Sequence, residues 1–191
     1  MNDQELAKRI QEGDEDAFRT LVDHHQEMVV NVCNSFLHNA DDAMDVSQDV
    51  FIKIFESIHK YKGQAKLSTW IYRIAVNHSL NHIRSKKRRN WLNTLDNLFN
   101  GDENEKPVYE PVDESSQEKQ IEAEEEQQVM IKALQKLPEK QKTALTLNSY
   151  EEMAYKEIAE VMQIPVNQVG VLINRARKNI QQYLIDFYKK N

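Results

Sequence analysis

One segment of the chain combines the residue types that bind separated nucleic-acid strands. Residues 57–95 contain nine Lys and Arg residues and no Asp or Glu. If residues 68–89 form a helix, an arc of roughly 80° carries an aromatic ring, amides and guanidinium groups. These groups belong to Trp70, Arg73, Asn77, Asn81, Arg84 and Arg88. A ring can stack on an unpaired base, amides can bond to base edges, and guanidinium groups can bind phosphates. The pattern therefore predicts contact with single-stranded or melted nucleic acid, rather than only a solvated cationic face.

The same segment ends in a cationic run that strengthens this prediction. Lys86, Lys87, Arg88 and Arg89 follow one another and would attract a phosphate backbone of any sequence. The net charge of the whole chain is −6, which by itself argues against a nucleic-acid partner. Acidic and basic residues are, however, strongly segregated along the chain, so local fields govern the choice of partner.

An acidic face is predicted on the segment just before the basic one. At 100° per residue, the acidic side chains between about residues 41 and 59 occupy one half of a helix. They are Asp41, Asp42, Asp45, Asp49 and Glu56, with Gln48 and Ile52 among them. Like charges on one helix face repel each other unless a basic surface relieves them. The face is thus a candidate protein-binding patch with a small apolar centre, and a merely solvated acidic face is the alternative.

The C-terminal part has the spacing of a helix-turn-helix, a common DNA-binding unit. Residues 155–162 and 166–180 are the two helices, and residues 163–165 form the turn. The inward side of the second helix carries Ile164, Val169, Ile173 and Ala176. Its outward side presents Asn167, Val171, Asn174 and Lys178, flanked by Gln168 and Arg175. Other small helical domains can imitate this spacing, so the pattern alone is moderately specific.

These surfaces require an all-α chain of two helical domains joined by an acidic flexible linker. Only four Gly and four Pro residues occur, which argues against an all-β fold. We expect an N-terminal domain over residues 1–92, a linker over 93–127 and a C-terminal domain over 128–191. The expected helices cover residues 14–38, 41–59, 68–89, 128–136, 138–151, 154–162 and 166–188, with Ser68 as the N-cap of the third.

Other features of the composition are consistent with a cytoplasmic protein. The single cysteine, Cys33, cannot form an internal disulfide. No apolar run approaches the ~18 residues of a membrane span, and no signal-peptide pattern is present. We therefore expect no membrane association.

Three segments together resemble the extracytoplasmic-function (ECF) sigma factors of bacterial RNA polymerase. They are DDAMDVSQDVFIKIF, KLSTWIYRIAVNHSLNHIRSKKRR and LQKLPEKQKTALTLNSYEEMAYKEIAEVMQIPVNQVGVLINRARKNI. Their order and separation also fit, so the resemblance covers nearly the whole chain except the acidic linker. It implies a factor that binds core RNA polymerase and directs promoter recognition, DNA melting and transcription initiation.

The resemblance also implies roles for individual residues. The acidic helix would dock on the clamp coiled coil of the largest polymerase subunit, through Asp45, Gln48, Asp49, Ile52 and Lys53. The basic helix and the loop before it would melt the −10 element and capture a base of the non-template strand. The matching positions are Lys62, Lys66, Ser68, Thr69, Trp70, Arg73, Asn77, Asn81 and Arg84. Family members are commonly held inactive by an anti-sigma protein, which is a further implied partner.

The chain departs from the family pattern at several positions. Asn81 stands where an Asp is usual, and Gln163 where the turn often carries Gly. The family's Thr-Val-Lys-Ser-Arg run is here Gln168-Val169-Gly170-Val171-Leu172. Missing cations lower affinity for phosphates. We therefore expect weak or altered recognition of the −35 element, with help from another recruiting protein.

Three other classes of protein compete with this interpretation. A stand-alone helix-turn-helix regulator would need neither the acidic face nor the aromatic stripe. An adaptor that binds only protein would leave the basic segment unexplained. An enzyme is disfavoured, because His78 and His82 are spaced as zinc ligands can be but lack a third ligand, and they project toward the packed side. We expect no metal, no cofactor and no catalytic residue.

Overall fold

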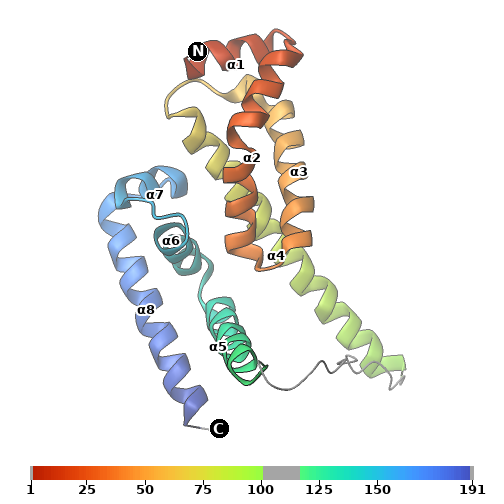
Figure 1. The fold of residues 1–191 in the computed structure, drawn as a ribbon, viewed down its shortest axis with the longest axis vertical. Coiled ribbons are helices and arrows are strands. Elements are labelled where there is room, and N and C mark those ends of the chain that lie inside the picture. The colour runs from red at the N-terminus through yellow and green to blue at the C-terminus, as the bar shows by residue number, and fades with distance from the viewer. Residues whose placement is uncertain (1, 101–116, 190–191) are drawn as a thin grey trace.

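The regular secondary structure of the described chain is entirely α-helical and 3-10-helical. The computed structural model describes residues 2–100 and 117–189, with side chains described for 2–92 and 125–189. Figure 1 shows the helices in order. They are α1 (Asp3–Gln11), α2 (Glu15–Leu37), α3 (Ala40–Ser57), the 3-10 turn η1 (Ile58–Lys60), α4 (Leu67–Asn100), α5 (Gln117–Lys136), α6 (Glu139–Ser149), α7 (Tyr155–Met162) and α8 (Val166–Tyr188). This confirms the all-α fold class. No helix in the described ranges is long and apolar enough to cross a membrane.

Helices α2, α3 and α4 form a bundle whose boundaries follow local sequence signals. Asp14 accepts a hydrogen bond from the Ala17 N–H at 3.0 Å and begins α2. Asn39 accepts one from the Asp42 N–H at 2.8 Å and begins α3. Both residues are preferred N-caps because their side-chain oxygens satisfy donors that the first turn leaves unpaired. The core is built from fully buried side chains on all three helices, among them Leu21, Val29, Val32, Phe36, Val50, Ile54, Ile71 and Ala75.

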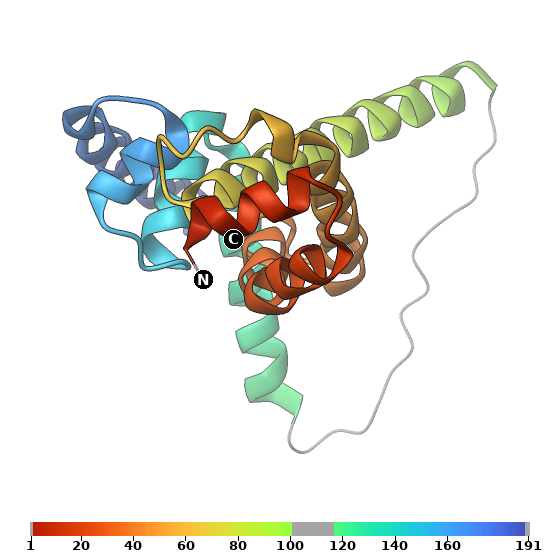
Figure 2. The ribbon, with the colours of Figure 1, turned by 90° about the horizontal axis from the view of Figure 1, so that it is seen from above.

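Helix α4 differs from the expected helix at both ends. It begins at Leu67, so Ser68 lies inside the first turn and the prediction that Ser68 is the N-cap was wrong. It ends at Asn100, and its C-terminal part projects beyond the bundle in both views (Figures 1 and 2). No Gly or Pro interrupts the sequence between Leu67 and Gly101, so nothing local ends the helix earlier.

Helices extend into both ends of the segment that we expect to be the linker. Residues 93–100 continue α4, and residues 117–127 belong to α5. The segment 117–127 is rich in Glu and Gln, which are strong helix formers, and this propensity favours a helix despite the repulsion among like charges. Residues 101–116, with Gly101, Pro107 and Pro111, lie outside the described residues.

The C-terminal helices contain the predicted helix-turn-helix. Val169, Ile173 and Ala176 on the inward side of α8 are fully buried, and Ile158 and Ala159 of α7 are buried against them. The turn between the two helices is sharp because Gln163 adopts a left-handed conformation, with φ of 55°. The Ile164 N–H then donates to the Ala159 carbonyl oxygen at 3.1 Å and closes the C-terminus of α7.

Gln163 occupies a backbone conformation that favours glycine. Replacing it with Gly is expected to raise the free energy of unfolding by about 1 kcal/mol, because a residue with a Cβ is strained there. The greater freedom of Gly in the unfolded chain offsets part of this gain. Chemical denaturation of Gln163→Gly and Gln163→Ala measures the effect. The Ala variant keeps the Cβ, so equal stabilisation of both would contradict the backbone explanation.

Candidate nucleic-acid interface

The loop before α4 and the first turn of α4 form a compact unit around two aromatic rings. Tyr61 is buried, and its hydroxyl donates to the Ala65 carbonyl oxygen at 2.8 Å. Its ring lies 5.7 Å from the Trp70 ring, tilted by 53°. Trp70 is half-buried and packs against the hydrophobic core. In the same unit Lys62 and Lys66 are exposed, Ser68 is half-buried and Thr69 is buried.

The predicted stripe lies on one side of α4, and part of it contacts the C-terminal helices. Asn77, Asn81 and Arg88 are exposed, as are Lys86 and Lys87. Arg73 donates from Nε and Nη2 to the Glu160 carbonyl oxygen near the C-terminus of α7, at 3.0 and 2.7 Å. The carbonyl groups at a helix C-terminus carry partial negative charge, so a guanidinium group binds there favourably.

Arg84 makes the second contact between the two halves of the structure, the N-terminal helices α1–α4 and the C-terminal helices α5–α8. Its Nε donates to Glu139 Oε2 at 2.8 Å, and its Nη1 donates to Asn81 Oδ1 at 2.9 Å. Both partners of the ion pair are roughly half exposed, at 57% and 43% of their side chains. A cavity of about 340 Å³ lies between the two contacts. Its lining includes Arg73, Asn77, Glu139, Thr143 and Gln163.

A buried lysine also joins the two halves. Lys142 of α6 is 6% exposed, and its Nζ donates to the Phe36 carbonyl oxygen, near the C-terminus of α2, at 3.2 Å. Burial, with a smaller effect from Lys87, lowers the pKa of Lys142 to about 8. Nearby, the Ser35 hydroxyl donates to Glu151 Oε1 at 2.6 Å.

The lowered pKa of Lys142 predicts a pH-dependent cost to stability. A base whose folded pKa lies below its ordinary value of 10.5 destabilises the fold while it is charged, and this cost disappears as the pH rises from about 8 to 10.5. Lys142→Met is expected to raise the free energy of unfolding at pH 7 by on the order of 2 kcal/mol. Denaturation curves should show this gain shrinking toward pH 10. The exposed Lys140→Met is the control, and a gain independent of pH would contradict the assignment.

The acidic face predicted on α3 is exposed, except at Asp42, which contacts α4. Asp45, Gln48, Asp49 and Lys53 are exposed, and Ile52 is 58% exposed. Lys53 Nζ donates to Glu56 at 3.1 Å. Asp42 forms an ion pair with α4: Lys86 Nζ donates to Asp42 Oδ2 at 2.6 Å, and this contact lowers the pKa of Asp42. Met44 and Phe55 enlarge the exposed apolar area beyond Ile52.

The outward side of α8 is exposed along its whole predicted length. It presents Asn167, Gln168, Val171, Asn174, Arg175 and Lys178. Val171 contributes an apolar group that is 47% exposed. The surface is thus accessible and carries two cations.

The sequence analysis did not identify the residues that contact α4 from distant positions in the sequence. Asp3 contacts the start of α4, and Glu139 and Glu160 contact its stripe. Nothing in local periodicity indicates such partners. His78 and His82 are half-buried, as expected for boundary residues, and no group of three potential metal ligands occurs among the described residues.

Among the described residues, this arrangement defines a helical protein of two parts that has a cationic helix, an exposed acidic face and a helix-turn-helix. Comparison with protein families identifies two regions of the chain. Residues 21–89 match Sigma-70 region 2, and residues 127–180 match Sigma-70 region 4.

Characterised relatives match almost the full length. The RNA polymerase sigma-H factor of Pseudomonas aeruginosa is 36% identical over 186 residues, covering 95% of this chain and 93% of the relative. The ECF RNA polymerase sigma-E factor of Haemophilus influenzae is 35% identical over 181 residues, covering 95% and 94%. The Escherichia coli sigma-E factor is 33% identical over 180 residues, covering 94% and 93%. The chain therefore belongs to the ECF family of RNA polymerase sigma factors.

Solved structures share the fold. CnrH, in complex with the cytosolic domain of CnrY, aligns with a TM-score of 0.64 and 21% identity, covering 96% of this chain and 97% of CnrH. The sigma factor RpoE of Bartonella quintana, in complex with the anti-sigma factor NepR, aligns with a TM-score of 0.54 and 20% identity, covering 87% and 96%. At this identity the likeness supports the two-domain helical fold.

Proposed function

We propose that this chain binds core RNA polymerase and directs it to promoters, where it melts the DNA and starts transcription. It acts as a binding factor in the cytoplasm and not as an enzyme. The N-terminal domain, residues 1–92, docks on the polymerase and opens the −10 element. The C-terminal domain, residues 128–191, contacts the −35 region. Family membership favours this function over a stand-alone helix-turn-helix regulator.

The observation that carries the proposal is that two adjacent helices present surfaces of opposite charge, an acidic face on α3 and a cationic stripe on α4. The exposed acidic face of α3 offers Asp45, Asp49 and Ile52 to a basic protein surface, the clamp coiled coil of the largest subunit. Helix α4 offers an oriented indole ring at Trp70 together with amides and cations. Such a helix can offset the cost of unpairing a base, because stacking and edge hydrogen bonds replace the lost pair.

The C-terminal domain supplies a weaker DNA contact in this proposal. The exposed side of α8 has Arg175 and Lys178, but Gly170 and Leu172 stand where the family often has cations, and Val171 where it often has a hydroxyl. We propose weak or altered −35 recognition and a second DNA-targeting protein that helps recruitment. Footprinting with purified holoenzyme tests this, and strong unaided protection at −35 would refute it.

The contacts between the halves imply competition within the chain. Arg73 and Arg84 cannot keep all their hydrogen bonds to Glu160 and Glu139 and at the same time turn their guanidinium groups fully toward phosphates. DNA, or the polymerase, must therefore move the C-terminal domain away from α4 before the stripe acts. An anti-sigma protein that binds both domains would favour the state in which the stripe is covered.

Glu139→Arg tests this competition by gain of function. Repulsion between the new Arg and Arg84 should open the halves, and the isolated protein should bind a single-stranded −10 oligonucleotide about three- to fivefold more tightly, the range expected for an exposed ion pair. Glu126→Arg makes the same charge change at an exposed position of α5 and serves as the control. Equal gains in the two variants, or unchanged compactness by small-angle scattering, would contradict the competition.

The central experiment is in vitro transcription with core polymerase on genomic DNA and mapping of the start sites. The proposal expects defined starts that depend on the added chain, together with co-purification of the chain and the core enzyme. A chain that binds duplex DNA without joining the polymerase would instead support the stand-alone regulator.

A further inference from the structure

Helix α1 holds the start of the DNA-contacting helix, and Asp3 makes the direct contact. Asp3 Oδ2 accepts a hydrogen bond from the Leu67 backbone N–H at 2.9 Å, across 64 positions of sequence. Leu67 is 1% exposed and is the first residue of α4, so its N–H has no carbonyl partner one turn earlier. The carboxylate satisfies this buried donor and places negative charge at the positive end of the helix dipole. Asp3 is thus an N-cap supplied by another helix.

Helix α1 also contacts the connection that leads into α4. Gln11 Nε2 donates to the Ile58 carbonyl oxygen at 2.8 Å, at the beginning of that connection. The Gln4 side chain lies against Gly63, where an added Cβ would come within 2.6 Å of Gln4 Nε2. Gly63 has φ of +70°, a backbone conformation that favours glycine, whereas the end of the flexible Gln4 side chain could move aside for a Cβ. The connection is therefore held at its start, middle and end by one helix.

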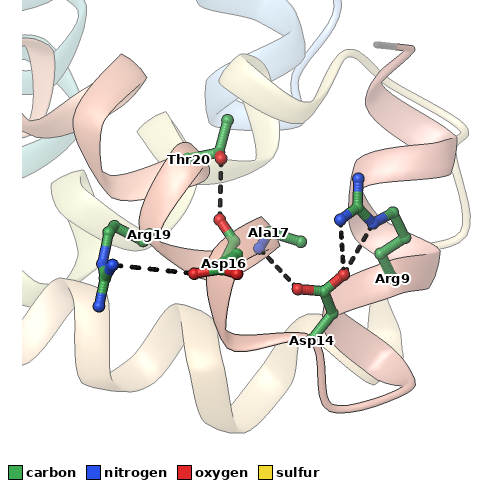
Figure 3. Close-up of polar contacts among 6 residues, drawn as sticks. All are labelled: Arg9, Asp14, Asp16, Ala17, Arg19 and Thr20. Carbon is green, nitrogen blue, oxygen red and sulfur yellow. Dashed lines mark hydrogen bonds and ion pairs between the residues drawn. The ribbon is translucent and has the colours of Figure 1, made fainter.

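Helix α1 is itself fixed to the bundle. Leu6, Ala7 and Ile10 are buried in the core. Figure 3 shows that Arg9 binds Asp14, from Nε at 2.8 Å and from Nη2 at 2.7 Å, while Asp14 also caps α2. A continuous path of contacts thus runs from the N-terminus of α2 through α1 to the N-terminus of α4.

We propose that Asp3 is a positioning residue for promoter melting, acting by fixing the first turn of α4. Ser68, Thr69 and Trp70 lie in that turn, and the Trp70 ring must hold one orientation to stack on an extruded base. Asp3 does not itself need to contact DNA. This inference rests on the proposed function.

The test measures open-complex formation by holoenzyme containing Asp3→Ala. We expect a decrease of about fivefold, in line with the loss of one helix cap, with unchanged affinity for core polymerase. Asp3→Asn should restore most of the rate, because its amide oxygen can accept the same hydrogen bond. Glu5→Ala removes an exposed acid from the same helix and should leave the rate unchanged.

A double-mutant cycle with Trp70→Ala separates positioning from general destabilisation. If Asp3 acts through the orientation of Trp70, Asp3→Ala should add little to the loss caused by Trp70→Ala. Fully additive losses would overturn the proposal. Hydrogen exchange on the free full-length chain gives an independent readout, since the Leu67, Ser68 and Thr69 amides should exchange faster in Asp3→Ala. Unchanged exchange would also overturn it.

These outcomes distinguish the inference from the function on which it rests. A wild-type chain that forms no open complexes would overturn the proposed function. A fully active wild type with an equally active Asp3→Ala would overturn only the role of Asp3.

Discussion

Replacing Trp70, Arg73 and Asn77 together with alanine is expected to slow open-complex formation at least about a hundredfold. Loss of base stacking alone costs roughly 1–3 kcal/mol, and the amide and guanidinium contacts add to it. Binding to core polymerase should change less than about twofold, since these residues lie on α4 and the proposed docking face lies on α3. Permanganate footprinting of the melted strands and a polymerase-binding titration measure the two effects.

The controls for this variant must show that slower melting is not caused by unfolding of the chain or by the loss of a positive charge. Trp70 is half-buried against Tyr61, so thermal unfolding has to show that the variant remains folded at the assay temperature. The pair Arg73→Ala with Asn77→Ala leaves the indole in place and should show an intermediate loss. Arg19→Ala removes a similar charge from an exposed position of α2 and should have little effect. Equal losses of melting and polymerase binding would contradict the division of labour between α3 and α4.

Reversing two charges on the acidic face of α3 should instead impair polymerase binding and leave DNA binding by α4 intact. Asp45→Lys with Asp49→Lys is expected to weaken binding to core polymerase by about a hundredfold, because two attractive contacts become repulsive. The chain's own binding to a single-stranded −10 oligonucleotide should not fall, since α4 is untouched. A titration at two salt concentrations should show a smaller defect at high salt, because salt screens exposed charges.

The matched control for this variant is Glu12→Lys with Glu27→Lys. Both acids are exposed and lie outside α3, Glu12 in the turn after α1 and Glu27 on α2, and the change in net charge is the same. An equal loss of polymerase binding in the control would mean that net charge, not the α3 face, drives docking. Ile52→Ala tests the apolar centre of the face separately.

Much of the fold could be predicted because local signals determine it. Asp14, a residue type preferred at helix N-caps, begins α2, and periodicity placed the buried Val169, Ile173 and Ala176 on the inward side of α8. The boundaries of α8 were predicted within a residue, since Pro165 precedes it and its apolar spacing is regular. The exposed acidic face of α3 and the exposed Asn77, Asn81 and Arg88 of α4 follow in the same way, because solvent-facing positions are set by helical geometry.

Contacts between distant residues were decided only by the tertiary structure. Ser68 looked like the cap of α4, but Asp3 fills that role from 64 positions away. Asp42 looked like part of the docking face, but Lys86 binds it. Arg73 and Arg84 looked free for DNA, but Glu160 and Glu139 hold them. Helical periodicity states which face a side chain occupies, whereas its partner depends on how whole helices pack, and that packing is fixed by the summed burial of many residues.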